Sequence, residues 1–124
     1  MKIRIKGNTI RIRLSKSEVD RFAVNHRIED HTEFGDTKFS YALVSGPQYA
    51  QMGADFKDGI ITMFLTEKQA EEWTKTTLIG LENDMPIGNG KNLYVLLEKD
   101  FKCLDETHED QTDKFDHPLA VKKP

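Results

Sequence analysis

The stretch from Met1 to Val19, MKIRIKGNTIRIRLSKSEV, constrains the fold most, because its pattern recurs later in the chain. Over residues 2–6 and 9–14, isoleucine and leucine alternate with polar, mostly basic residues, which is the period of two half-buried strands. Gly7-Asn8 lies between these runs and favours a two-residue hairpin turn, since both residues tolerate a positive φ. This turn places the isoleucines of the two strands opposite one another on one face, with the basic residues on the other.

A helix is predicted directly after this hairpin. Ser15 and Glu18, three positions apart, form the capping box that satisfies free N–H groups at a helix start. Fifty-one positions later (66 − 15) Thr66 and Gln69 repeat this box, and the turn Asp58-Gly59 precedes it between two further alternating runs. Agreement of turn, cap and strand phase at one offset predicts an internal repeat of two ββαββ units, at about residues 1–45 and 53–100.

Two such units give an α+β fold with eight mostly antiparallel strands and two helices. We expect a pseudo-twofold, duplicated structure in which the strands close into an eight-stranded barrel or a strongly curved sheet, with the helices at its ends or over one face. An open sandwich of two four-stranded sheets is the alternative. In the second unit, strands are expected at about 77–84 and 93–100, with Pro86 limiting the earlier one.

The domain organisation expected is a single α+β domain over residues 1–101, followed by an acidic, extended tail over residues 102–124. The chain of 124 residues is 37% hydrophobic with a net charge of −3, so any basic site must be local. The sequence has no long apolar run, no signal-peptide pattern and one cysteine, Cys103. We therefore expect a cytoplasmic protein without a disulfide, a cofactor or a membrane partner, and the oligomeric state stays open.

The opening hairpin is the principal candidate site. Its register places Lys2 opposite Arg13 and Arg4 opposite Arg11, and like charges in such positions cost up to about 1 kcal/mol per pair. The repeat does not demand this, because Asp55 stands where Arg4 stands in the first unit. The predicted anion-binding residues are Lys2, Arg4, Lys6, Arg11 and Arg13.

Two interpretations of these five basic residues remain open. Residues 105–116 contain six acidic residues and one lysine, so this segment could dock along the hairpin and neutralise it. Alternatively, the hairpin binds a phosphate-containing ligand or an acidic segment of a protein partner. No aromatic residue is interleaved with the basic ones, which argues against single-stranded nucleic acid.

Other chemistry is less supported by the sequence. Cys103, His108 and His117, with Asp105 and Asp113 between them, carry zinc-binding atoms, but their spacing matches no familiar zinc motif. The carboxylates predicted on corresponding strands of the two units have no pattern that makes them converge: Glu29, Asp30, Glu33, Glu82 and Asp84. No nucleophile elbow, phosphate-binding loop or metalloprotease motif occurs, so no catalytic residue is predicted.

The chain resembles a family of short uncharacterised bacterial proteins, a domain of unknown function, that begin with nearly the string MKIRIKGNxIRxRL. The resemblance includes Phe34-Gly35, residues 82–99 (ENDMPIGNGKNLYVLLEK), residues 100–105 and Glu109-Asp110-Gln111. It implies membership of that family and brings no activity or catalytic residue with it.

A looser likeness is to the triphosphate-tunnel enzymes, eight-stranded barrels that bind phosphate chains with basic rows such as residues 10–13 (IRIR). Their first strand carries alternating metal-binding glutamates, whereas residues 2–6 here read KIRIK, so the likeness implies anion binding without turnover. The sequence thus favours a small non-enzymatic binding or interaction domain. The alternative is a phosphate-ester or polyphosphate-acting barrel enzyme, which requires the basic residues to line the interior.

Overall fold

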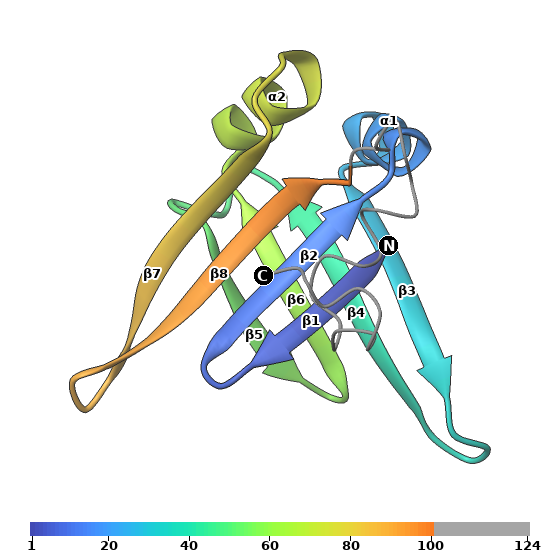
Figure 1. Cartoon of the computed structure of the whole chain (residues 1–124), viewed down its shortest axis with the longest axis vertical. Coiled ribbons are helices and arrows are strands. Elements are labelled where there is room, and N and C mark those ends of the chain that lie inside the picture. The colour runs from blue at the N-terminus through green and yellow to red at the C-terminus, as the bar shows by residue number, and fades with distance from the viewer. Residues whose placement is uncertain (101–124) are drawn as a thin grey trace, which may run out of the picture.

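The computed structural model describes residues 1–100, which form eight strands and two helices (Figure 1). The first half of this region contains β1 (Lys2–Lys6), β2 (Thr9–Leu14), α1 (Lys16–Asn25), β3 (Arg27–Glu33) and β4 (Lys38–Ser45). The second half contains β5 (Gly53–Lys57), β6 (Ile60–Leu65), α2 (Glu67–Lys75), β7 (Gly80–Gly88) and β8 (Lys91–Lys99). The order of elements is therefore the same in the two halves.

The first hairpin has the predicted register. Gly7 adopts a φ of +55° in the turn, a conformation that costs a residue without a side chain little. Ile3 pairs with Ile12, and Arg4 pairs with Arg11. Alternation and turn geometry specify this arrangement together, since a slip by one residue would turn every isoleucine outward.

Both predicted capping boxes are present. The Ser15 hydroxyl accepts a hydrogen bond from the Glu18 N–H, and the Glu18 carboxylate accepts one from the Ser15 N–H, at 3.4 and 2.8 Å. Thr66 and Gln69 make the same reciprocal pair at 3.0 and 3.1 Å. Each box satisfies two N–H groups and fixes the point at which strand gives way to helix.

The strands form two separate four-stranded sheets, so the closed barrel and the single curved sheet are wrong and the sandwich alternative is the one found. Sheet A has the order β1-β2-β8-β7, and sheet B has the order β3-β4-β6-β5. The chain crosses from sheet A to sheet B through α1 and returns through α2. Within each sheet the two hairpins join through a parallel pair, β2 with β8 or β4 with β6. A short link between consecutive strands favours antiparallel pairing, but β4 and β5, which such a link joins, are not neighbours in sheet B.

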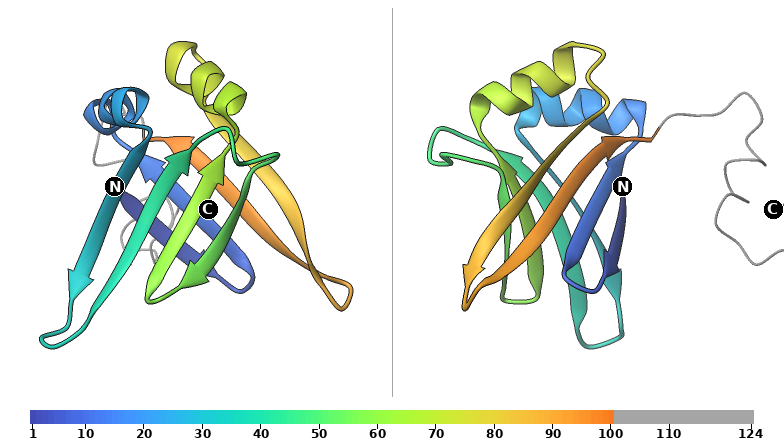
Figure 2. Two further views of the ribbon diagram at one scale, coloured as in Figure 1. Left: turned by 180° about the vertical axis from the view of Figure 1, so that it is seen from behind. Right: turned by 60° about the vertical axis from the view of Figure 1, so that its left-hand side comes forward.

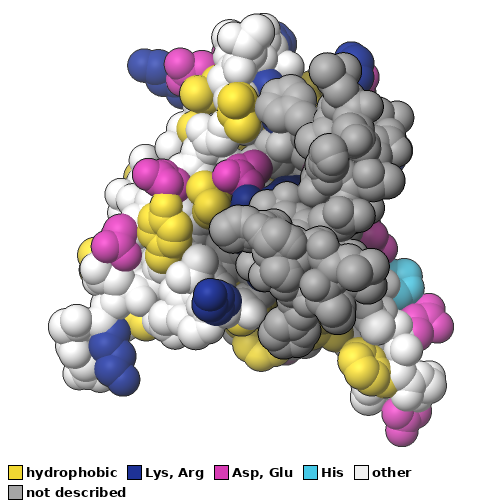
Figure 3. All heavy atoms as spheres, in the orientation of Figure 1, with side chains coloured by type: hydrophobic (Ala, Val, Ile, Leu, Met, Phe, Trp, Pro, Cys, Tyr) yellow, Lys and Arg dark blue, Asp and Glu magenta, His cyan; other side chains and the backbone are white. Residues whose placement is uncertain are grey.

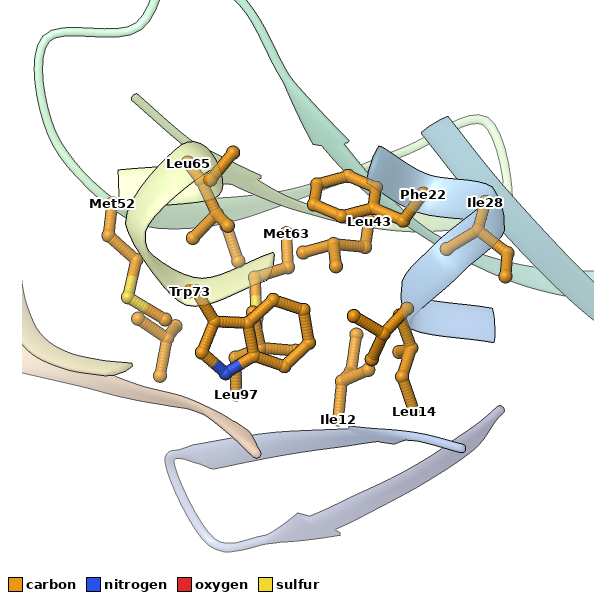
Figure 4. Close-up of a cluster of buried hydrophobic side chains, with 14 residues drawn as sticks. Ile12, Leu14, Phe22, Ile28, Leu43, Met52, Met63, Leu65, Trp73 and Leu97 are labelled. Atoms are coloured by element: carbon orange, nitrogen blue, oxygen red, sulfur yellow. The ribbon is translucent and has the colours of Figure 1, made fainter. Parts of the chain in front are cut away.

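Sheet A lies in front of sheet B in Figure 1, and the two helices lie side by side across one end (Figures 1 and 2). All four hairpin turns lie at the opposite end. One hydrophobic core joins the sheets and helices, with Trp73 of α2 edge-on to Phe22 of α1 at a ring-centroid distance of 6.3 Å (Figure 4). The Trp73 indole N–H donates to the Ile79 carbonyl at 3.0 Å, which satisfies its only polar group.

The final hairpin differs from expectation. β7 begins at Gly80 rather than near residue 77 and continues through Pro86 to Gly88, past the predicted end at residue 84. β7 is an edge strand, and its register shifts between Pro86 and Gly88; sheet edges and bulges are the places where a strand tolerates proline. The predicted acidic tail, residues 102–124, lies outside the described residues.

Candidate anion-binding site

The hydrophobic and basic residues of the first hairpin face opposite sides of sheet A. Ile12 is fully buried, and Ile3 and Ile10 pack against the core. Because side chains alternate along a strand, the basic residues occupy the outer face of the sheet, away from sheet B. The five predicted residues, Lys2, Arg4, Lys6, Arg11 and Arg13, therefore form one row, which we call the basic row.

Two carboxylates, Glu98 in β8 and Asp100 just after it, neutralise part of this row. Arg11 Nε and Nη2 donate to Glu98 Oε1 at 2.9 and 2.6 Å, and Arg13 Nε lies 3.6 Å from the same oxygen. Lys2 Nζ lies 2.9 Å from a carboxylate oxygen of Asp100, and Arg13 Nη1 lies 3.7 Å from the other. The parallel register of β2 and β8 causes this contact, since it places Arg13 beside Glu98.

Two basic residues have no such compensation. Within residues 1–100, Arg4 and Lys6 make no ion pair. Lys2, Arg4, Arg11 and Arg13 line one depression of about 320 Å³ together with Ile3. Within residues 1–100 the five cations of the row face two carboxylates, Glu98 and Asp100, which is an excess of three positive charges. The face of sheet A seen in Figure 3 shows acidic and basic side chains next to one another.

A second charged contact fixes the start of β1. The Met1 amine donates to the carboxylate of Glu18, the capping residue of α1. Burial alone would raise the pKa of Glu18, but hydrogen bonds from this amine and from Ser15 outweigh it and lower the pKa below its ordinary value. The basic row is therefore anchored at both strands: through Met1 to α1 and through β2 to β8.

Sequence reasoning missed Glu98 and Asp100 as partners of the basic row and looked for them in residues 105–116. A signal was present, because Glu98 and Asp100 alternate with Lys99 and so share one face of the last strand. What the sequence could not show is that this strand lies beside β2.

The other candidates do not assemble within the described residues. β3, with Glu29, Asp30 and Glu33, is an edge of sheet B, whereas β7, with Glu82 and Asp84, is an edge of sheet A. No group of three or more metal-binding side chains exists in residues 1–100. Cys103, His108 and His117 lie outside the part that the structure describes.

The enzyme alternative requires the basic row to line an interior. In residues 1–100 the interior between the sheets is instead filled by apolar side chains, and the row lies outside. The geometry of a triphosphate tunnel is therefore not formed by this sheet. Separately, no helix in residues 1–100 is both long and apolar enough to cross a bilayer.

The fold and this surface define an α+β protein of two four-stranded sheets, one of which carries a row of basic residues on the outer face of its β1–β2 hairpin. The chain belongs to the family of unknown function DUF7009, whose model matches residues 1–119. This confirms the predicted membership of a domain of unknown function. No protein of curated function and no solved structure is significantly similar to the chain.

Proposed function

We propose that this protein is a small, non-enzymatic cytoplasmic binding domain whose basic row takes a phosphate-containing ligand. The observation that carries the proposal is the excess of positive charge at one place: Arg4 stands directly opposite Arg11, and only Arg11 has a carboxylate partner within residues 1–100. An anion placed between the two guanidinium groups would relieve their repulsion and accept forked hydrogen bonds from both.

The arrangement suits a ligand with several phosphate oxygens. The row extends along two strands, so neighbouring phosphate groups of one chain could each meet a basic side chain. Arg11 is pre-positioned by its two hydrogen bonds to Glu98, so little conformational freedom is lost when it binds. The exposed position implies modest affinity that weakens with added salt.

The experiment is a thermal-shift series with tripolyphosphate, ATP and a short single-stranded oligonucleotide, each with and without magnesium. A ligand that binds only the folded state raises the melting temperature with concentration, by about 2.7 kcal/mol of stability at a hundredfold excess over Kd. Tripolyphosphate is expected to stabilise the wild type, and Arg4→Gln is expected to remove most of the shift.

Arg21→Gln is the matched control, because Arg21 is likewise exposed and makes no ion pair within residues 1–100, but lies on α1. It removes the same charge and should leave the shift unchanged. Equal losses in both variants would indicate nonspecific charge attraction, and no shift in the wild type would reject the phosphate site. The acidic segment 105–116 is the competing occupant of the basic row. A synthetic peptide of that sequence tests this: if the segment binds there, the peptide should raise the melting temperature of the wild type more than that of Arg4→Gln.

We also propose that the fold arose by duplication of one ββαββ unit. The two capping boxes stand 51 residues apart, and exchanging β1–β4 with β5–β8 converts the strand order of sheet A into that of sheet B. On this proposal the basic row is a feature that one unit acquired, since Asp55 occupies the place of Arg4 in the other.

A further inference from the structure

The end of the sandwich opposite the helices is open and apolar. A cleft of about 350 Å³ lies there between the two sheets. Sheet A contributes Ile5, Ile10 and Leu93 to it, and sheet B contributes Phe39, Phe56 and Ile61. The Phe39 and Phe56 rings lie 6.3 Å apart, in the range of a favourable aromatic contact. Helices cover the core at the other end, whereas nothing within residues 1–100 covers this one.

Each of the four hairpins also exposes one large hydrophobic side chain near its turn. These are Ile5, Phe34, Phe56 and Ile87, which are 54, 66, 64 and 48% exposed. Figure 3 shows hydrophobic side chains at this end of the molecule, which is the lower edge of the view. Two of the four, Ile5 and Phe56, also line the cleft, and contiguous exposed apolar surface marks an interaction site more often than singly scattered side chains do.

The charges at the four turns differ between the sheets. Residues 6–9 and 88–91 of sheet A carry Lys6 and Lys91 and no acidic residue, a net charge of +2. Residues 33–38 and 57–60 of sheet B carry Lys38 and Lys57 against three acidic residues, Glu33, Asp36 and Asp58, a net charge of −1. The open end is therefore apolar in the middle, positive along one side and negative along the other.

We propose that this open end binds the open end of a second copy of the same chain. A twofold axis parallel to the plane between the sheets places the sheet A turns of each copy against the sheet B turns of its partner. The positive side of one copy then meets the negative side of the other, twice, while the two apolar clefts meet in the centre. An apolar centre with a charged rim is the usual anatomy of a protein interface.

The size of the surface sets the strength of the association. Four large side chains, about half exposed, offer roughly 400 Å² of apolar area per copy, and the polar rim brings the total for both copies near the roughly 1,000 Å² that a specific interface needs. The dimer is accordingly weak and forms with increasing concentration.

Sedimentation velocity of the full chain, from micromolar to near-millimolar concentration, tests this proposal. The wild type is expected to change from monomer to dimer over this range. The Ile5→Ser, Phe56→Ser double variant is expected to raise the dissociation constant roughly tenfold or more. Ile79→Ser is the matched control, because Ile79 is also 54% exposed but follows α2 at the covered end. Far-UV circular dichroism verifies that each variant is folded.

Charge reversal distinguishes a second copy from any other occupant. Lys6→Glu with Lys91→Glu changes the sheet A turns from +2 to −2 and should abolish the dimer. Adding Asp36→Lys changes the sheet B turns from −1 to +1, which mirrors the wild type and should restore association. Any one of three results would overturn the proposal. The wild type could be a monomer at every concentration, Ile79→Ser could disrupt the dimer as much as the Ile5→Ser, Phe56→Ser variant does, or the triple charge variant could fail to dimerise.

Discussion

Replacing Glu98 by glutamine should lower stability and raise phosphate affinity at the same time. Glu98 accepts two hydrogen bonds from Arg11 and lies 3.6 Å from Arg13, with roughly a quarter of its side chain exposed. Glutamine keeps the size and one acceptor oxygen but removes the charge. Partly exposed charge-assisted contacts of this kind contribute about 1 kcal/mol, so urea unfolding should show a loss of that size.

Among residues 1–100, the same change raises the excess of positive charge on the basic row from three to four. A carboxylate and a phosphate charge about 6 Å apart in water repel by about 0.7 kcal/mol, so removing the carboxylate should tighten binding about threefold per phosphate charge. Isothermal titration calorimetry with tripolyphosphate at low salt measures this, and added salt should shrink the gain. Unchanged or weaker binding by Glu98→Gln would refute the assignment of the ligand to this face.

Three further outcomes follow from the fold. Glu18→Gln should cost about 1 kcal/mol at neutral pH, because glutamine keeps the capping box, as Gln69 does in α2, but loses the charge that faces the Met1 amine. The folded-state pKa of Glu18 is lowered, so its contribution is present above the ordinary value of 4.5 and is lost as pH falls through the folded value. Urea unfolding of this variant should therefore depend less on acid. Trp73→Ala should cost about 3–5 kcal/mol, measured by chemical unfolding, because it empties a fully buried site. Gly80→Ala should lower the free energy of unfolding by about 1–3 kcal/mol, because the new Cβ would lie 2.9 Å from the Leu97 carbonyl oxygen. The melting temperature should fall accordingly, and an unchanged melting temperature would contradict that packing.

Local structure could be predicted from the sequence because independent signals agree. Alternation and a glycine-containing turn both specify the pairing of Arg4 with Arg11, and a reciprocal cap specifies where each helix begins. The second hairpin pairs Glu33 with Lys38 across a turn that likewise contains a glycine, Gly35. Such signals involve residues close in sequence, whose geometry the chain itself constrains.

The arrangement of the hairpins could not be predicted in the same way. Thr9 pairs with Tyr94, 85 positions away (94 − 9), and no turn fixes a parallel pairing at that distance. Without it, eight strands are compatible with a barrel or with two sheets. The location of Glu98 beside the basic row depends on this pairing, which is why the five basic residues could be named and their partners could not.

The most direct test of the basic row is a titration of the ¹⁵N-labelled protein with tripolyphosphate, followed by amide and arginine Nε chemical shifts. We predict saturable changes at Arg4 and Arg11, at neighbouring amides of β1 and β2, and at Glu98, with α2 and the distant turn at Asp36 unaffected. Absence of saturable changes, or changes centred on any other element, would contradict the central claim that this hairpin is the ligand-binding surface of the protein.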